Sequence, residues 1–133
     1  MALPCFAGQG GPFAARKGEV RGEVPQENRP ALATLYTALM TDLMLTRLGA
    51  NVGDLIVEGG FAANPTFSAL IAALRPGQRV FSGSDASGTA RGAALLAQWP
   101  PRAYVLPESL ASEPLRLPGL HAYRTAWMAA IGS

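Results

Sequence analysis

Apolar residues recur at helical spacing over residues 29–48. Pro30 fits the first turn of a helix, and Gly49 ends the pattern. Further methionines and leucines widen the apolar face most of the way round the helix. The pattern predicts a long helix that is buried between layers or against another domain. Its main apolar stripe is formed by Leu32, Leu35, Tyr36, Leu39 and Leu43.

The next pattern, over residues 55–74, changes from strand to helix. Leu55-Ile56-Val57 is a short apolar run typical of a strand buried on both faces. The glycine pair Gly59-Gly60 ends this run, and Asn64-Pro65 combines a good N-cap with a good first helical residue. The helix is expected to continue to Leu74, with Phe67, Leu70 and Ile71 on one face.

The junction between this strand and this helix has a geometry that suits a ligand. Glycines let the backbone approach a bound group closely, and a helix N-terminus offers unpaired N–H groups and a partial positive charge. An ordinary tight turn between a strand and a helix would give the same sequence pattern. The residues by themselves leave both interpretations open.

A second strand and a third helix follow. Residues 79–82 predict a short strand, and residues 89–98 predict a helix rich in alanine. Gly92 lowers the helix propensity by about 1 kcal/mol relative to Ala, so we expect another element to pack closely there. The alternation of helices and strands predicts an α/β fold with mostly parallel strands flanked by helices.

Two core strands are too few for a self-sufficient α/β domain. Their edges would stay open, and an open edge invites pairing with other backbone. We therefore expect residues 29–99 to be an α/β core that belongs to something larger. Self-association through the open sheet edge, giving a homo-oligomer, is one consequence of this prediction.

The two ends of the chain have different patterns. Glycine and proline repeatedly break residues 1–28, which predicts a loop or hairpin extension with a short edge strand within residues 18–22. Residues 100–119 contain five prolines and predict an extended connection. Residues 120–131 predict a last amphipathic helix carrying Tyr123, Trp127 and Ile131. Residues 1–133 are thus expected to form a single, partial domain.

Composition and charge restrict the classes of partner. The chain has 133 residues, 49% of them hydrophobic, and a net charge of +2 from 11 basic and 9 acidic residues. The basic residues are spread along the chain, so neither nucleic acid nor a polybasic membrane surface is an expected partner. No run is long enough for a transmembrane helix, and no secretory signal is visible. Cys5, the single cysteine, excludes an internal disulfide, and the cytoplasm is the expected location.

The chain lacks the common catalytic motifs. Residues 83–89 resemble a phosphate-binding P-loop, but Thr89 stands where that loop needs a lysine. The Gly59-Gly60 pair does not fit the dinucleotide pattern G-x-G-x-x-G. The acids Asp54, Glu58 and Asp85 form no obvious acid/base pair. We therefore predict neither a catalytic residue nor a metal ligand in this chain.

Three segments together resemble the C-terminal domain of the FGGY carbohydrate kinases, which belong to the actin-like ATPase superfamily. Residues 56–65, Ile56-Val57-Glu58-Gly59-Gly60-Phe61-Ala62-Ala63-Asn64-Pro65, are similar to the adenosine motif of that family. Residues 88–97 resemble the Gly-Ala-Ala helix that follows it. Leu3-Pro4, Gly11-Pro12-Phe13 and the helix from Arg29 resemble the segment before the motif, and Tyr123 and Trp127 resemble the C-terminal helix. The fold implied is a partial ribonuclease-H-like domain.

The resemblance implies a chemistry and a set of nucleotide-binding residues. FGGY kinases transfer the γ-phosphoryl group of ATP, bound with Mg²⁺, to a hydroxyl of a sugar or polyol. Gly59 and Gly60 would line the α-phosphate and the adenosine, Asn64 would contact the adenosine, and Phe61 would shape the pocket. The helix around Gly92 would form a contact at the hinge between two domains.

Several parts of the family fold have no counterpart in this sequence. The first kinase domain, which carries the phosphate loop, the sugar site, the catalytic Asp and the Mg²⁺ ligands, cannot be placed here. We therefore expect the chain to be about the last third of such a kinase, with little or no turnover by itself. The alternative is a non-catalytic interaction or oligomerisation module derived from such a kinase.

Overall fold

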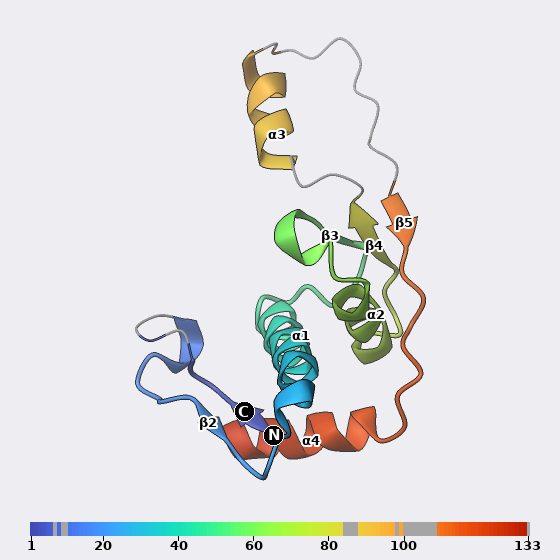
Figure 1. Ribbon diagram of the computed structural model, residues 1–133. Coiled ribbons are helices and arrows are strands. Elements are labelled where there is room, and N and C mark those ends of the chain that lie inside the picture. The colour runs from blue at the N-terminus through green and yellow to red at the C-terminus, as the bar shows by residue number, and fades with distance from the viewer. Residues whose placement is uncertain (7, 9–10, 84–87, 98, 100–108, 133) are drawn as a thin grey trace.

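The computed structural model describes residues 1–6, 8, 11–83, 88–97, 99 and 109–132. Its main elements stack in three layers, which lie from top to bottom in Figure 1: a small sheet, a pair of helices, and a single helix. The chain order is β1 (Ala2–Leu3), η1 (Gly11–Phe13), β2 (Glu19–Val20), η2 (Gln26–Asn28), α1 (Arg29–Arg47), β3 (Leu55–Val57), η3 (Gly59–Phe61), α2 (Pro65–Leu74), β4 (Val80–Gly83), α3 (Gly88–Ala97), β5 (Ser109–Ala111) and α4 (Leu120–Ile131).

The middle layer consists of α1 and α2, which pack side by side. Ala38, Leu39 and Leu43 of α1 are buried, as are Phe67 and Ile71 of α2. The periodicity over residues 29–48 therefore predicted the long helix correctly. Its burial is less complete than expected, because Leu32, Leu35 and Tyr36 are only half-buried and Leu48 is 76% exposed. Burying each large apolar side chain contributes about 1.5–3 kcal/mol, so this layer holds much of the core.

The sheet has the order β3-β4-β5. β3 and β4 are parallel, with Leu55 opposite Val80, and α2 forms the crossover between them. The side chain of Val80 is buried towards α2, and the hydroxyl of Ser82 donates a hydrogen bond of 2.8 Å to the hydroxyl of Ser68 on that helix. The predicted α/β class and the parallel crossover are confirmed.

Two details of the sheet differ from the sequence prediction. β5 lies within the stretch that we expected to be only an extended connection, and it pairs antiparallel with β4, so the core sheet is mixed. Ile56 is 64% exposed, so β3 is not buried on both faces. The physical reason is that α1 and α2 cover one face of the sheet, whereas alternate residues of a strand point to opposite faces.

The helix α3 also differs from expectation. Ala90, Gly92, Ala93 and Ala94 are all exposed. A Cβ atom added to Gly92 would meet no atom within 4 Å, so the close packing expected there is not found in the described part of the chain. Figure 1 shows the reason, because α3 lies on the far side of the sheet from the helical layer.

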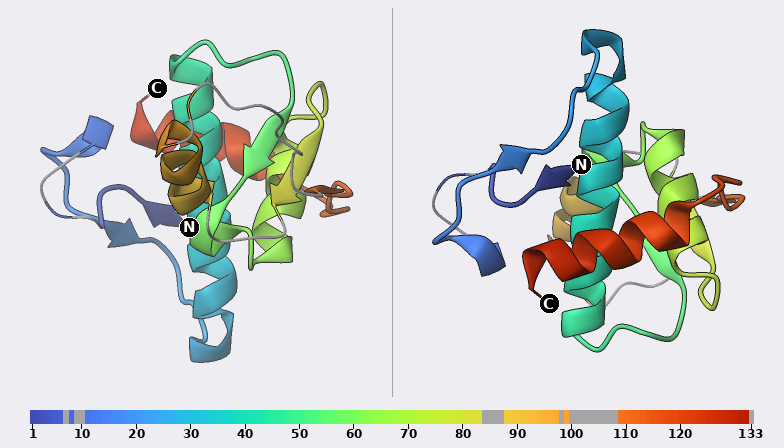
Figure 2. Two further views of the ribbon diagram at one scale, coloured as in Figure 1. Left: turned by 90° about the horizontal axis from the view of Figure 1, so that it is seen from above. Right: turned by 90° about the horizontal axis from the view of Figure 1, so that it is seen from below.

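The N-terminal hairpin and α4 close the molecule on its other side. β1 pairs antiparallel with β2, which narrows the edge strand expected within residues 18–22 to Glu19–Val20. Trp127 of α4 is fully buried, and its Nε1 donates a hydrogen bond of 2.7 Å to the carbonyl of Ala2. Figure 2 shows the hairpin on one side of α1 and the sheet with α2 on the other, while α4 crosses below α1.

A buried ion cluster joins the three helices. Asp42 of α1 is fully buried, and its carboxylate accepts hydrogen bonds from Arg75 at the end of α2 (2.9 Å) and from Arg124 of α4 (2.7 Å). Arg75 also donates to the side chain of Gln78, whose amide reaches the carbonyl of Gly53 at 2.9 Å. The cluster therefore fixes the helices and the loop before β3 relative to one another.

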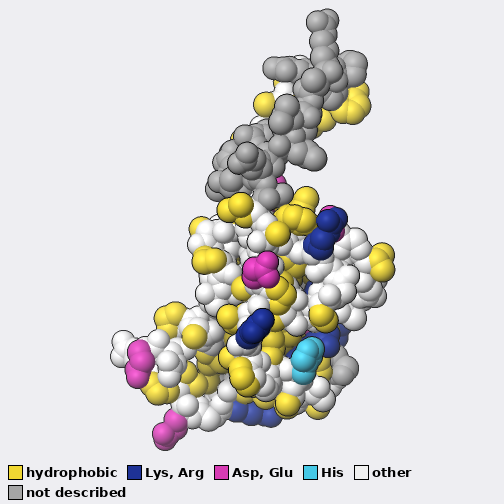
Figure 3. Space-filling view, turned by 90° about the vertical axis from the view of Figure 1, so that its right-hand side faces the viewer, with side chains coloured by type: hydrophobic (Ala, Val, Ile, Leu, Met, Phe, Trp, Pro, Cys, Tyr) yellow, Lys and Arg dark blue, Asp and Glu magenta, His cyan; other side chains and the backbone are white. Residues whose placement is uncertain are grey.

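The surface gives two further findings. None of the described helices is long and apolar enough to span a bilayer. On the face shown in Figure 3, the Lys and Arg side chains of the described residues lie at separate positions and form no continuous basic patch.

Candidate functional site

The candidate site begins at the carboxyl end of β3, where the chain turns sharply. Gly59 has φ of 70°, a left-handed conformation that glycine adopts without strain. The turn is closed by hydrogen bonds of 3.0 Å from the N–H of Ala62 to the carbonyl of Gly59, and from the N–H of Asn64 to the carbonyl of Phe61. This single turn delivers the chain directly to the N-terminus of α2.

The space beside the glycine pair is open. A Cβ atom added to either Gly59 or Gly60 would meet no atom within 4 Å, and Gly60 is exposed. The backbone at this turn is therefore accessible to a bound group, as the ligand interpretation of the sequence requires. The conformation of Gly59 alone would also suit an ordinary turn, so the open space beside Gly60 is the more informative feature.

Asn64 is the N-cap of α2, as its position in the sequence predicted. Its Oδ1 accepts a hydrogen bond of 3.2 Å from the N–H of Phe67, and its Nδ2 lies 3.4 Å from the hydroxyl oxygen of Thr34 on α1. The side chain thus fixes the N-terminus of α2 against α1. An amide carries two acceptor sites and two donors, so one of each is still able to contact a ligand.

Phe61 presents an aromatic ring beside the turn. The ring packs on the buried Phe67, with centroids 4.9 Å apart and planes tilted by 34°. The side chain is nevertheless 51% exposed. Phe61 is therefore held against the core and keeps exposed surface on which a flat ligand can stack.

A cavity of about 520 Å³ lies next to the same turn, between the start of α2 and the strands β4 and β5. Its volume is in the range of small-molecule sites. The hydroxyl groups of Ser82 and Ser112, 3.2 Å apart, supply polar groups in its wall. The lining residues are Ala62, Pro65, Ala69, Ser82, Gly83, Leu110, Ala111, Ser112 and Glu113.

The charges around the cavity favour a neutral group. Among the described residues of its lining, Glu113 is the one that carries a charge, and Glu58 at the end of β3 lies beside Gly83. Arg79 is at the opposite, amino end of β4, where it pairs with Asp54 at 2.7 Å. The cavity therefore suits the nucleoside part of a ligand better than its phosphates, which would face carboxylates there.

Sequence reasoning found only part of this arrangement. Gly59, Gly60, Phe61 and Asn64 lie together at one turn, as their closeness in sequence requires. Ser112 and the rest of the β5 wall were missed, because three residues among prolines give too short a pattern to predict a strand. Within the described residues, no three His, Cys, Asp or Glu side chains lie close enough to hold a metal ion.

Comparisons with known proteins show the class to which this fold and site belong. The profile described as "Carbohydrate kinase FGGY, C-terminal domain" matches residues 1–104. The crystal structure of a carbohydrate kinase from Novosphingobium aromaticivorans superimposes with a TM-score of 0.80 at 30% sequence identity, over 98% of this chain. A search of curated proteins gave no match.

The chain therefore belongs to the FGGY carbohydrate kinase family and represents its C-terminal domain, which confirms the resemblance drawn from the glycine turn and the alanine-rich helix. It spans 28% of the length of the kinase from Novosphingobium aromaticivorans. The match also supports a partial actin-like ATPase fold.

Proposed function

We propose that the chain is the nucleotide-side portion of an ATP-dependent carbohydrate kinase, which transfers the γ-phosphoryl group to a hydroxyl of a sugar or polyol. The family supplies the reaction class. The observation that carries the proposal is the open glycine turn at the start of α2, next to a cavity that suits a nucleoside. Ligands of α/β sheets commonly bind at the carboxyl ends of the strands, and this turn follows the carboxyl end of β3.

Each predicted site residue has a role in this proposal. The backbone of Gly59 and Gly60 passes close to the α-phosphate and the ribose, because neither residue has a side chain to obstruct them. Phe61 offers its exposed ring surface to the nucleoside. Asn64 keeps the N-terminus of α2 in place and contacts the adenosine through the donor and acceptor that capping leaves unused.

The phosphates and the sugar need groups from another part of the kinase. The described residues of the cavity lining include one carboxylate and no cation, whereas phosphoryl transfer depends on positioning and on stabilising charge at the transferred group. In this proposal the catalytic carboxylate, the Mg²⁺ ligands and the sugar site belong to that other part. The isolated chain would then bind an adenine nucleotide weakly and turn it over slowly or not at all.

A pair of matched glycine variants tests the binding site. Gly60 and Gly77 are both exposed, and a Cβ atom on either meets nothing within 4 Å, so both are expected to tolerate leucine in the fold. Gly60→Leu should weaken binding of ADP at least tenfold in calorimetric titration, since the side chain would occupy the space proposed for the nucleotide. Gly77→Leu, in the turn after α2, should leave binding unchanged. Equal affinities of the two variants would contradict the proposal.

A complementation assay tests the reaction. The N-terminal portion of a full-length FGGY carbohydrate kinase is added to the chain, and ATP hydrolysis is measured with and without a panel of sugars and polyols. Sugar-dependent hydrolysis that requires both portions would support the proposed kinase activity. If the chain binds ADP but hydrolysis is not restored, the proposed nucleotide site would stand. The proposal that the chain acts as one part of a split kinase would then be wrong.

A second candidate function is a non-catalytic interaction module. The observation favouring it is that each face of the sheet has an exposed apolar side chain: Ile56 is 64% exposed on one face, and Leu110, opposite Ser82 on the other face, is 74% exposed. This function predicts self-association that does not respond to ATP and is unaffected by Gly60→Trp. Sedimentation of the wild type and the variant, each with and without ATP, distinguishes the two candidates.

A further inference from the structure

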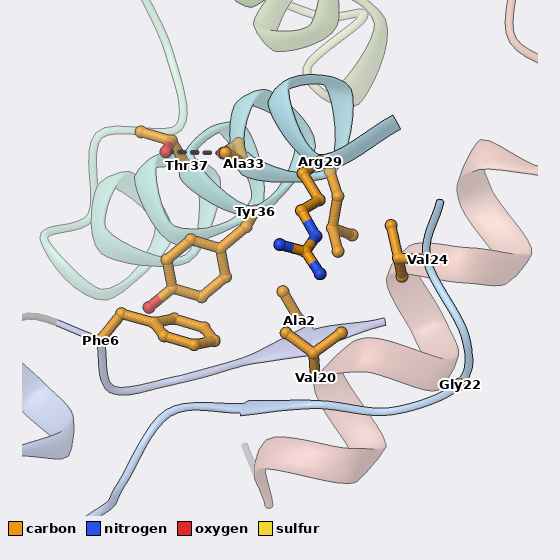
Figure 4. A pocket seen from close by; sticks show the side chains of 10 residues that line it. Ala2, Phe6, Val20, Gly22, Val24, Arg29, Ala33, Tyr36 and Thr37 are labelled. Atoms are coloured by element: carbon orange, nitrogen blue, oxygen red, sulfur yellow. Dashed lines mark hydrogen bonds between the residues drawn. The ribbon is translucent and has the colours of Figure 1, made fainter. Parts of the chain in front are cut away.

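A second cavity, of about 580 Å³, lies far from the glycine turn in the fold, between the β1–β2 hairpin and the first half of α1 (Figure 4). Neither the family match nor the proposed function gives it a role. Its volume is in the range of sites for small organic molecules. The lining residues are Ala2, Phe6, Val20, Gly22, Val24, Arg29, Leu32, Ala33, Tyr36 and Thr37.

The walls of this cavity are mostly apolar. Ala2 and Val20 come from the hairpin, and Figure 4 shows both side chains facing α1. Phe6 and Tyr36 close one end with an edge-to-face contact, their ring centroids 5.3 Å apart and their planes at 89°. Burial raises the pKa of the Tyr36 phenol above its usual value, so this group stays neutral at physiological pH. The surroundings favour an apolar or aromatic body.

Of the cavity-lining residues that the structure describes, Arg29 is the one that carries a charge. Its guanidinium has no hydrogen bond or ion pair with any residue that the structure describes, and Figure 4 shows this group over the space between Tyr36 and Val20. Arg29 is also the first residue of α1, and the first turn of that helix contains no acidic residue to balance it. A cation is unfavourable at a helix N-terminus, so its position is not explained by the stability of the helix.

We propose that this cavity binds a small amphipathic anion, with its apolar or aromatic body between the hairpin and α1 and its single carboxylate, sulfonate or phosphate group on Arg29. The guanidinium supplies a fork of N–H donors that matches such groups. A nucleoside triphosphate fits poorly, because its several negative charges would meet one cation. A free sugar fits poorly too, because the Thr37 hydroxyl already donates to the carbonyl of Ala33 at 2.8 Å and the walls offer few other polar partners.

Two fluorescent probes with the same apolar body test the proposal. The anion 8-anilinonaphthalene-1-sulfonate and its uncharged counterpart N-phenyl-1-naphthylamine differ in the sulfonate that Arg29 would bind. The wild type should bind one sulfonate probe per chain, more tightly than the uncharged probe. Arg29→Gln should weaken the sulfonate about three- to tenfold and leave the uncharged probe unchanged. Arg116→Gln, which changes an exposed arginine outside the cavity, is the matched control and should leave the affinity for both probes unchanged.

Variants that fill the cavity test its location. Ala33→Trp fills it from α1, and Val20→Trp fills it from the hairpin; both positions are exposed enough to accept a larger side chain. Each variant that retains the circular dichroism spectrum of the wild type should no longer bind either probe. Three results would overturn the proposal: sulfonate affinity independent of Arg29, binding that persists in a filled cavity, or a dimer of the chain that excludes both probes.

Discussion

The helical side and the sheet side of this domain differ in how completely their side chains are covered. Below the sheet, even a carboxylate and an indole are enclosed: Asp42 and Trp127 are both fully buried and hydrogen-bonded. On the sheet, Ile56 and Leu110 remain largely exposed. The helices therefore supply most of the buried core, whereas the outer face of β3 is largely exposed.

The largest effect is expected at the ion cluster. Asp42→Asn removes the negative charge between Arg75, whose side chain is 6% exposed, and Arg124. Because an unpaired charge would stay buried, the free energy of unfolding should fall by about 3–5 kcal/mol in urea denaturation. Asp54→Asn, which breaks the exposed pair with Arg79, is the control and should cost at most about 1 kcal/mol. Equal losses of unfolding free energy in the two variants would show that the buried and the exposed ion pair contribute equally to stability.

A pair of isoleucine variants compares the two sides directly. Ile71 of α2 is 1% exposed, so Ile71→Ala should lower the free energy of unfolding by about 2–5 kcal/mol, from lost burial and a residual cavity. Ile56→Ala on the uncovered face of β3 should cost about 1 kcal/mol or less, chiefly through strand propensity. A large loss at Ile56 would mean that this face is covered in solution.

The two tryptophans give a smaller contrast. Trp127→Phe removes the hydrogen bond to Ala2 and part of a buried ring, so it should destabilise the fold by about 1–3 kcal/mol. Trp99 is 72% exposed, so Trp99→Phe should leave the thermal midpoint almost unchanged. Intrinsic fluorescence of each variant would report the same contrast, with the blue-shifted emission belonging to Trp127.

The smallest effect is expected at alkaline pH. Burial raises the pKa of both Tyr36 and Tyr123 above the usual value near 10. Each phenol is then more easily ionised in the unfolded chain, so its contribution to stability is present below pH 10 and is lost as the pH rises above it. Both side chains are partly exposed, which keeps the loss small. The double variant Tyr36→Phe, Tyr123→Phe should reduce this alkaline loss in pH-dependent urea denaturation.

Local patterns predicted the elements well. The periodicity over residues 29–48 gave α1 within a residue of its observed end, and Asn64-Pro65 gave the start of α2, because capping and helical spacing are set by neighbouring residues. The FGGY resemblance came from short motifs in the same stretches, and the family match confirms it. The roles of Gly59, Gly60, Phe61 and Asn64 in binding remain predictions.

Contacts between distant segments could not be predicted. Asp42 lies on the apolar stripe of α1, three residues after Leu39, and its partners Arg75 and Arg124 come from other helices. A carboxylate on an apolar face was the available signal of a buried ion pair. β5 has only three residues, and it pairs with a strand that is distant in the sequence. Local periodicity therefore predicts neither the strand nor its pairing with β4. The exposure of Ile56 depends on which face of the sheet the helices cover. The apolar run Leu55-Ile56-Val57 gives no information about that face.

Nuclear magnetic resonance titration of the ¹⁵N-labelled chain with Mg²⁺-ADP shows directly whether the glycine turn binds a nucleotide. We expect the amide signals of Gly59, Gly60 and Phe61 to shift together, in fast exchange, with those of Ser82 and Ser112 on the neighbouring cavity wall. The signals of residues around Asp42 and Trp127 should stay in place. Saturable shifts confined to other parts of the chain, or no shifts at millimolar nucleotide, would contradict the assignment of this turn as the nucleotide site.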